Sequence, residues 1–367
     1  MRFPEFNGEW ETKLINDLAV VIGGGTPDTT IKSYWDGEIQ WFTPSEIGKN
    51  KYVDSSLRTI TEEGLNNSSA KLLPPNTILL SSRATIGECS LSLRECATNQ
   101  GFQSLVSKKC YVDFLYYLIQ TKKRDLIRKS CGSTFLEISA NEVRKIQVSV
   151  PTDVEQQKIA GLLSLIDERI ATQNKIIEDL KKLKSAIRKK MFSLLKDEYT
   201  ESFEINQLLD YEQPTAYIVA NDEYSTDTSL TPVLTANKGF ILGYTDEKFG
   251  IYQKGECIIF DDFTMDAKYV SFPFKVKSSA IKILTAKPNV NLRFMFEYLS
   301  HWELKSEEHK RHYISEISPL VIELPSKEKQ NIIALLMTSL NNKLTIEEKA
   351  KIRYEVQKGY LLSQMFI

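Results

Sequence analysis

The sequence predicts an α+β protein in which two globular α/β domains are separated by two long antiparallel helices that form an intramolecular coiled coil. Three observations support this fold class. One stretch of sequence occurs twice, at residues 148–192 and 322–366. Both copies carry apolar residues at helical spacing, and the segment before each copy alternates strand-like runs with turn residues.

The two copies align without a gap, and their apolar residues agree in phase along the whole alignment. Identical residues occupy the paired positions Pro151 and Pro325, Gln156 and Gln330, Ile159 and Ile333, Ala160 and Ala334, Leu162 and Leu336, Lys175 and Lys349, Lys184 and Lys358, Met191 and Met365, and Phe192 and Phe366. The match continues upstream to Glu142 and Glu316. We therefore expect two copies of one plan, with a first domain at 1–150, a central helix at 151–196, a second domain at 197–324 and a distal helix at 325–367.

Each expected helix begins with a capping signal that follows a proline. Thr152 and Glu155 form a capping-box pattern after Pro151, and Ser326 follows Pro325 at the equivalent position. The first apolar stripe comprises Ile159, Leu162, Ile166, Ile170, Ile177, Leu180, Ile187, Met191 and Leu194. The second comprises Ile333, Leu336, Leu340, Leu344, Tyr354, Leu361 and Met365.

An apolar stripe on a long helix needs a partner to cover it. A helix of about 44 residues is a rod of roughly 65 Å, at ~1.5 Å per residue. The simplest partner for each rod is the other copy, which gives a two-helix coil. The alternative is that each rod packs on its own globular domain.

The globular segments contain short strand-like runs. In the first half these are LAVVIGG, EIQWFT, TILLSS and GFQSLVS, followed by a helical stretch at 113–129. In the second half they are SLTPVLT, ECIIFDD and SSAIKIL, followed by the helical stretch FMFEYLSHWEL. The middle sections of the two halves differ, and residues 23–48 have no clear counterpart in the second half.

Composition limits the class of protein. The chain has 367 residues, 42% hydrophobic and 26% charged, with a formal net charge of -1. This balance argues against a protein that coats nucleic acid non-specifically, although a basic face remains compatible with it. Five cysteines without a CxxC pair indicate reduced thiols and no zinc site. The N-terminus lacks an apolar signal region and no run approaches membrane-spanning length, so we expect a cytoplasmic protein without membrane contact.

Charge is unevenly distributed along the first rod. Nine basic residues lie between Arg169 and Lys196, and residues 197–213 then contain six acidic residues and no basic one. This pattern fits a helix that meets an anionic partner, and it equally fits a solvated helix face.

No motif in the sequence predicts catalysis. The segment GGGTPDTTIKSYWDGEIQWFTPSEIG at 23–48 resembles a phosphate loop only in its glycines, because Pro27 removes a backbone donor and no Gly-Lys-Ser/Thr follows. His309 and His312 lie close to Glu307 and Glu308, but their spacing does not match a zinc-binding helix. We therefore expect a non-catalytic chain that holds no cofactor and no metal.

Several motifs in order resemble the specificity subunit of type I restriction–modification systems. In the first half they are the stretch at 23–48, LLSSRATIGECSL (79–91), ATNQGFQSLV (97–106), GSTFLEIS (132–139) and the helix start VPxxxEQxxIAxLL. The second half resembles another class of target recognition domain in that family, through TPVLTANKGFILGYT (231–245), IIFDDFT (258–264), FPFKVKSSAIKIL (272–284) and HKRHYISEIS (309–318).

The resemblance implies two target recognition domains, each of which binds one half of a bipartite, asymmetric site on double-stranded DNA. The helices would set the gap between the half-sites and dock two modification subunits, which carry an S-adenosylmethionine-dependent adenine methyltransferase. Restriction subunits would supply the nuclease and translocase. A stand-alone DNA-binding module and a coiled-coil scaffold that never touches DNA are the alternatives.

Short polar side chains, arginine and lysine are the groups that read bases and bind phosphates. The candidates in the first domain are Thr26, Lys32, Tyr34, Ser45, Ser82, Arg83, Asn99 and Gln100. Those in the second domain are Thr235, Lys238, Asp262, Ser278, Ser279, Lys310, Arg311 and His312. The glycines at 23–25 would let the backbone approach a ligand closely. Trp41, Phe42, Phe102 and Ile138 are expected in the core.

Overall fold

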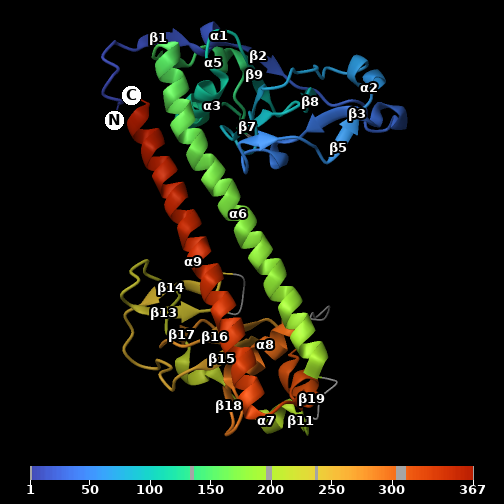
Figure 1. Ribbon diagram of the computed structural model, residues 1–367, viewed down its shortest axis with the longest axis vertical. Helices are drawn as coiled ribbons and strands as arrows, with labels where there is room; N and C mark the ends of the chain where they lie inside the picture. Colours follow the sequence, from blue (N-terminus) through green and yellow to red (C-terminus); the bar gives the residue numbers. More distant parts are fainter. Residues whose placement is uncertain (1, 133–135, 196–200, 236–238, 303–310, 367) are drawn as a thin grey trace. The chain divides into compact units, whose positions relative to one another are not determined.

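The computed structural model describes residues 2–132, 136–195, 201–235, 239–302 and 311–366 (Figure 1). The chain forms two compact units: unit 1 comprises residues 1–176 and 348–367, and unit 2 comprises residues 177–347. The long helices α6 (Asp153–Leu195) and α9 (Lys327–Met365) each contribute to both units. The four segments expected from the repeat are copies along the chain rather than compact units, and that division stays a prediction.

Unit 1 contains two sheets closed by a terminal ribbon. The ribbon pairs β1 (Glu11–Leu14) antiparallel with β10 (Gln147–Val150), so the globular part begins and ends at the start of α6. A five-stranded sheet has the order β2 (Ala19–Gly23), β9 (Gln103–Ser107), β6 (Ile78–Leu80), β7 (Cys89–Ser92), β4 (Tyr52–Val53). A three-stranded sheet has the order β5 (Arg58–Ile60), β3 (Trp35–Phe42), β8 (Cys96–Thr98), with β3 and β8 parallel.

The helices of unit 1 are short apart from α6 and α9. They are α1 (Ile15–Leu18), α2 (Glu62–Asn66), α3 (Val112–Thr121), α4 (Lys123–Arg128) and α5 (Ala140–Arg144), with 3₁₀ turns at Lys32–Tyr34 and Pro44–Glu46. The single helical stretch expected at 113–129 is thus two helices. They separate at Lys122, whose backbone leaves helical geometry at φ -90° and ψ 7°.

Unit 2 has the same arrangement of strands. Its ribbon pairs β11 (Glu201–Glu204) with β19 (Val321–Leu324). A four-stranded sheet has the order β12 (Leu209–Glu212), β18 (Ile281–Ala286), β15 (Cys257–Asp261), β16 (Ala267–Val270), and a three-stranded sheet has the order β14 (Ile241–Thr245), β13 (Thr231–Leu234), β17 (Lys275–Val276). Helices α7 (Ile205–Leu208) and α8 (Leu292–His301), a 3₁₀ turn at Pro214–Tyr217 and a π-helical turn at Tyr313–Ile317 complete it.

The two units share one topology. The order β2-β9-β6-β7 matches β12-β18-β15-β16, and the order β5-β3-β8 matches β14-β13-β17 with the same parallel pair. Strand β3 therefore has a counterpart in β13, although the stretch at 23–48 lacks sequence similarity to the second half. The ribbons and the short helices α1 and α7 extend the repeat to the start of each domain, where Ile15 and Ile205 are both fully buried.

Each unit buries apolar residues from its domain and from both long helices in one core. In unit 1, Phe114 and Tyr117 of α3 share a core cluster with Ile159 and Leu163 of α6 and with Leu361 of α9. In unit 2, the cluster joins Phe294 of α8 to Phe192 of α6 and Ile333 of α9. Within unit 1 the start of α6 meets the end of α9, so the two helices are antiparallel there. Both expected partners of the stripe, the other helix and the globular domain, are thus used together.

The repeated glutamine beside each helix start has a structural role. The Gln156 side chain donates to the Pro151 carbonyl (2.9 Å) and accepts from the Tyr111 backbone amide (2.9 Å), which ties α6 to the start of α3. Gln330 makes the same two contacts with Pro325 (2.9 Å) and Asn291 (2.8 Å). These shared contacts explain why both copies of the repeat have a glutamine at this position.

Two residues that were predicted to lie on the buried stripes are exposed. Leu194 is 52% exposed and Leu336 is 41% exposed. The buried faces use Phe192 and Leu195 on α6, and Ile333 and Met337 on α9. At 3.6 residues per turn, the face that includes Met191 continues four residues on at Leu195, and the face that includes Ile333 continues four residues on at Met337. No helix in the described ranges is both long and apolar enough to cross a membrane.

Candidate nucleic-acid interface

Three backbone hydrogen bonds gather loop segments at one edge of the domain in unit 1. The Ser82 amide donates to the Gly101 carbonyl (2.8 Å), and the Ile138 amide donates to the Ser82 carbonyl (3.1 Å). The Asn99 amide donates to the Phe42 carbonyl (3.1 Å), which joins the β8–β9 turn to the end of β3. This frame brings together five of the predicted residues, namely Ser45, Ser82, Arg83, Asn99 and Gln100. Thr26 joins them, because its hydroxyl donates to the Gln100 side-chain carbonyl.

Unit 2 repeats this frame bond for bond. The Asp262 amide donates to the Ala280 carbonyl (2.9 Å), the His312 amide donates to the Asp262 carbonyl (2.9 Å), and the Lys277 amide donates to the Leu234 carbonyl (2.9 Å). The equivalent positions are therefore Ser82 and Asp262, Gly101 and Ala280, Ile138 and His312, Asn99 and Lys277, and Phe42 and Leu234. The frame gathers the predicted residues Thr235, Asp262, Ser278, Ser279, Arg311 and His312. Lys238 and Lys310 lie outside the described residues.

The gathered residues differ in their access to a ligand. Thr26, Ser45, Gln100, Ser278 and Arg311 are exposed, and Arg83, Asn99, Thr235 and Ser279 are half-buried. Ser82, Asp262 and His312 are buried, with exposed fractions of 0%, 1% and 2%. Their side chains lie beneath the surface of the chain, so in the structure these three residues hold the frame together rather than face a ligand. Whether any of these residues contacts DNA stays a prediction.

Asp262 is held by internal contacts. Its Oδ1 accepts from the Tyr313 backbone amide (2.8 Å), and its Oδ2 lies 3.4 Å from the Lys282 Nζ, with both side chains 1% exposed. A buried carboxylate needs such a cation and such donors to offset its lost hydration. The His312 Nδ1 lies 2.8 Å from the Glu316 Oε2, which turns this ring toward its own helical turn.

Lys32 and Tyr34 are not brought to this frame. They form the 3₁₀ turn that precedes Trp35, at the start of β3, whereas Ser45 and Asn99 lie at its far end. An eight-residue strand separates its ends by roughly 20 Å. The Tyr34 carbonyl accepts from the Thr61 amide (3.0 Å), which fixes this turn against α2.

The glycine-rich stretch is packed against the chain itself. A Cβ on Gly24 would lie 2.0 Å from the Asn99 carbonyl oxygen, and one on Gly25 would lie 2.4 Å from the Ala70 nitrogen. The Trp41 Nε1 donates to the Gly25 carbonyl (2.9 Å). We expected these two glycines to let a ligand approach the backbone. In the structure, they let neighbouring segments of the chain approach it instead. Trp41, Phe42, Phe102 and Ile138 are buried as expected.

Arg83 is a half-buried cation at the frame in unit 1. Its Nη2 lies 2.8 Å from the Glu137 Oε2, and the two side chains are 43% and 35% exposed. The next residue, Ala84, has a φ of 54°, in the left-handed region that residues with a Cβ rarely adopt. The turn after β6 is thus held in an uncommon conformation that presents Arg83 at the edge of the frame.

Sequence reasoning missed Lys277. This exposed lysine follows β17 and occupies the position of Asn99 in the shared frame. The signal was its place directly before Ser278 and Ser279, at the end of a strand. Aligning the two domains by topology finds it, whereas aligning them by residue identity does not.

The described side chains offer no activated nucleophile among the buried thiols. Burial raises the pKa of Cys89, Cys96, Cys110 and Cys257 to about 12, so these thiols stay protonated at neutral pH. Within the described ranges, no group of three or more histidine, cysteine and acidic side chains could hold a metal ion. His309, Glu307 and Glu308 lie outside those ranges.

A pocket of about 560 Å³ lies beside α3 and the segments of α6 and α9 in unit 1, and none of the residues that form the frame's hydrogen bonds lines it. Its lining mixes both charges, with Lys49 and Lys358 opposed by Glu88, Asp167 and Glu168. It lies where the domain meets the helices, so it belongs to the joint between them rather than to the candidate interface.

Comparison with known proteins finds a family match for the first part of the chain. Residues 7–182 match the family described as "Type I restriction modification DNA specificity domain". The chain is 38% identical over 216 residues to the type I restriction enzyme MjaIX specificity subunit of Methanocaldococcus jannaschii, covering 58% of this chain and 50% of that protein. It is 39% identical over 178 residues to the EcoR124I/EcoR124II specificity subunit of Escherichia coli, covering 43% of each. The match thus spans about half the length of these curated relatives.

Solved structures agree with the fold. A type I restriction–modification S subunit from M. genitalium superimposes with a TM-score of 0.65 at 16% identity, over 100% of this chain and 99% of that one. A chain from a study of "complex assembly" and "conformational transition of the type I R-M system" gives 0.58 at 12% identity, over 98% of both chains. The fold class expected from the repeat, two β-rich domains with long helices packed together, is confirmed. Residues 7–182, close to half of the chain, therefore belong to the family of type I restriction modification DNA specificity domains.

Proposed function

We propose that the chain is a DNA-sequence specificity subunit that acts in the cytoplasm, in which each domain reads one half of a bipartite, asymmetric site. The observation that carries this proposal is the duplicated frame. Both domains hold three loop segments with equivalent hydrogen bonds, yet the side chains at the frame differ. A scaffold that is kept constant while its presented groups change is suited to reading two different sequences.

The chemistry at the frame is that of groove readers. The first domain presents Arg83, Asn99 and Gln100, which can make bidentate contacts with guanine or adenine. The second presents Lys277, Ser278, Ser279 and Arg311. These exposed or half-exposed groups are our proposed DNA contacts, with Thr26, Ser45 and Thr235 beside them.

The long helices carry a second feature, which supports the docking of partner subunits. In unit 1, Val154 (67% exposed) and Leu165 (59%) of α6, and Ile352 (57%) and Val356 (67%) of α9, stand in solvent. In unit 2, Ile332 (59%), Leu335 (73%) and Ile346 (60%) of α9 do the same. Apolar residues repeated along a helix surface are typical of a face that another helix covers.

We infer that these surfaces bind two modification subunits, one for each unit, and that restriction subunits join that complex. The helices would also set the gap between half-sites. The chain itself would contribute no catalysis, so rigorously purified chain should neither methylate nor cut DNA.

The test is to coexpress the chain with its neighbouring modification subunit, purify the complex and measure binding to duplexes. The proposal expects copurification, together with salt-sensitive binding to a bipartite duplex that scrambling either half-site weakens. Binding of DNA by the chain without any modification subunit bound would favour the stand-alone module. Absence of DNA binding in both forms would favour the scaffold.

A further inference from the structure

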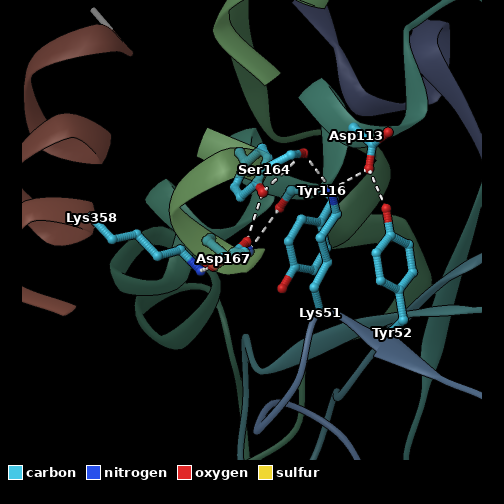
Figure 2. A network of polar contacts seen from close by, with 9 residues as sticks. Lys51, Tyr52, Asp113, Tyr116, Ser164, Asp167 and Lys358 are labelled. Atoms are coloured by element: carbon cyan, nitrogen blue, oxygen red, sulfur yellow. Dashed lines mark hydrogen bonds and ion pairs between the residues drawn. The ribbon is translucent and has the colours of Figure 1, made fainter. Parts of the chain in front are cut away.

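A polar network ties the first domain to both long helices in unit 1 (Figure 2). The Tyr117 hydroxyl on α3 donates to the Asp167 Oδ2 on α6 (2.6 Å), and the Asp167 Oδ1 lies 2.8 Å from the Lys358 Nζ on α9. The Asp167 and Lys358 side chains are only 13% and 19% exposed. Burial, and after it the nearby Asp167 carboxylate, raise the pKa of Tyr117, so this hydroxyl remains a donor. Three elements therefore meet at one carboxylate.

Unit 2 has a network at the same place. The Arg188 Nη2 on α6 lies 2.6 Å from the Glu297 Oε2 on α8, and the Asn341 Nδ2 on α9 donates to the Glu297 Oε1 (3.3 Å). The Glu297 side chain is 3% exposed and that of Arg188 is 17% exposed. Burial lowers the pKa of the nearby Lys184, and the Glu297 carboxylate opposes that shift. Here too, one carboxylate joins the domain to both helices.

The two networks occupy equivalent positions. The helix repeat pairs Asp167 with Asn341 and Lys184 with Lys358. The contacts of Gln156 with Tyr111 and of Gln330 with Asn291 align α3 with α8, and this alignment pairs Tyr117 with Glu297. At this pair of positions each unit has one carboxylate, but the acid lies on the long helix in unit 1 and on the domain in unit 2. The neutral residue that donates to the acid lies on the opposite element in each unit: Tyr117 is on the domain in unit 1, and Asn341 is on the long helix in unit 2.

At a second equivalent pair of positions, the charge of the domain side chain reverses in sign. Asp113 on α3 is an acid, and the buried Lys51 Nζ lies 2.5 Å from it and donates to the Ser164 hydroxyl on α6 (2.7 Å). The equivalent of Asp113 is Arg293 on α8, whose Nη1 lies 3.5 Å from the Thr338 hydroxyl, the equivalent of Ser164. The domain helix thus differs in charge between the two units at both positions, with neutral Tyr117 against acidic Glu297 at the first and acidic Asp113 against basic Arg293 at the second.

We propose that these joints are matched sets that orient each recognition domain on its own pair of helix segments and make the two domains non-interchangeable. The first domain placed on the helix segments of unit 2 would set Tyr117 against Asn341, and Arg188 would lack its acid. The second domain placed on the helix segments of unit 1 would set Glu297 against Asp167. Two carboxylates in a desolvated site repel each other, and an unpaired buried cation is similarly unfavourable. Tyr117, Asp167 and Glu297 are therefore positioning residues, in an inference that rests on the proposed DNA-reading function.

A double-mutant cycle tests the matching in the intact chain. Tyr117→Glu places a second acid beside Asp167, and Asp167→Asn leaves Lys358 without its acid. Each single variant is expected to lower Tm by about 5 °C. The double variant recreates the pattern of unit 2, with the acid on the domain, and it should regain at least half of that loss. Losses that simply add in the double variant would overturn the proposal.

The mirror cycle keeps the test decisive if Tyr117→Glu does not fold. Glu297→Tyr with Asn341→Asp moves the acid of unit 2 onto the long helix, and the same partial recovery is expected. Asp125→Asn is the matched control, because Asp125 pairs with Arg128 within α4 on an exposed surface and its loss should leave Tm unchanged.

A DNA readout separates positioning from simple stability. At a temperature where every variant is folded by near-ultraviolet circular dichroism, Tyr117→Glu should weaken discrimination at the first half-site at least tenfold and leave the second unchanged. The double variant should restore it. Unchanged discrimination in the folded single variant would contradict a positioning role. Failure of the wild-type chain to bind DNA would instead contradict the proposed function, since the stability cycle needs no DNA.

Discussion

Arg83 shows how one side chain can be presented by the frame without being part of it. Its backbone belongs to the turn after β6, fixed through the Ser82 bonds, and its guanidinium is 2.8 Å from Glu137. That ion pair is partly exposed, so it contributes little to stability and can exchange for a base edge or a phosphate. Its buried neighbours hold the turn, while Arg83 remains available.

Replacing Arg83 with Ala should therefore weaken binding or relax base choice at one half-site only. An arginine that reads a base contributes about 1–3 kcal/mol of discrimination. The measurement is competition binding with duplexes that carry single-base changes in either half-site. Arg94→Ala is the control, because this exposed arginine of the same unit pairs with Asp54 and takes no part in the frame. Equal losses at both half-sites, or none, would count against Arg83 as a reader.

A buried lysine in unit 2 gives a pH-dependent prediction. The Lys275 Nζ lies 2.6 Å from the Glu247 Oε2 and donates to the Phe249 carbonyl (2.7 Å), with the lysine side chain 4% exposed. The hydrogen bond from Lys275 is the main cause that lowers the pKa of Glu247 below its ordinary value of 4.5. The pair stabilises the fold fully above that ordinary value. Its contribution is lost as pH falls through the lower, folded pKa.

Glu247→Gln should thus reduce the free energy of unfolding by about 1–2 kcal/mol at pH 7. The difference from the wild type should shrink below about pH 4, because the wild-type carboxyl is then protonated as well. Urea unfolding at a series of pH values measures this. Glu178→Gln, which removes an exposed acid paired with Lys182 in the same unit, should have little effect at any pH. A difference for Glu247→Gln that does not depend on pH would refute the ionic explanation.

At the scale of elements, the long helices were the part of the fold that the sequence predicted well. A 3.6-residue periodicity with caps is a local signal, and it located α6 and α9 to within two residues. The exact buried face was less certain, as Leu194 and Leu336 show, because neighbouring apolar residues compete for it. The sequence also predicted the short strands. It did not predict their order in the sheets, because strand pairing depends on contacts between residues that are distant in sequence.

The candidate interface was predictable only as a set of residue types. The structure brings most of the predicted polar residues together, because loops between adjacent strands meet at one sheet edge, and their contact with DNA stays a prediction. The burial of Ser82 and Asp262 could not be foreseen, since it depends on backbone bonds to Gly101 and Ala280 across the sheet. The separation of Lys32 from the frame follows from the length and direction of β3, which no local pattern encodes.

The helices also give a prediction of their own, if they set the gap between half-sites. Seven residues inserted between Ile176 and Ile177, with seven more between Glu347 and Glu348, preserve the apolar phase of each rod. Each rod becomes about 10 Å longer, at ~1.5 Å per residue. That length corresponds to roughly three base pairs, at ~3.4 Å per base pair. The recognised gap should therefore lengthen by about one to three base pairs while both half-site sequences stay the same.

An insertion in α6 alone is the matched comparison for that experiment. It lengthens one rod while the other retains its length, so the gap should lengthen less or activity should fall. The original gap with full activity in the doubly extended chain would show that the helices do not act as a spacer.

At the scale of the whole molecule, the duplication is the feature from which function follows. Two domains with one topology and one hydrogen-bond frame differ in the side chains at equivalent positions of the frame, such as half-buried Asn99 in one and exposed Lys277 in the other. Identical readers would select a symmetric site. Unlike readers on a repeated scaffold should select two unlike half-sites separated by bases that neither domain reads.

The most direct test of this claim is to map N6-methyladenine across the genome of a host that expresses the chain with its neighbouring modification subunit. The account predicts one bipartite motif with two different half-sites, a fixed unread gap, and methylation that disappears when the chain is omitted. A symmetric motif, a continuous motif without a gap, or a methylation pattern that is unchanged without the chain would contradict it.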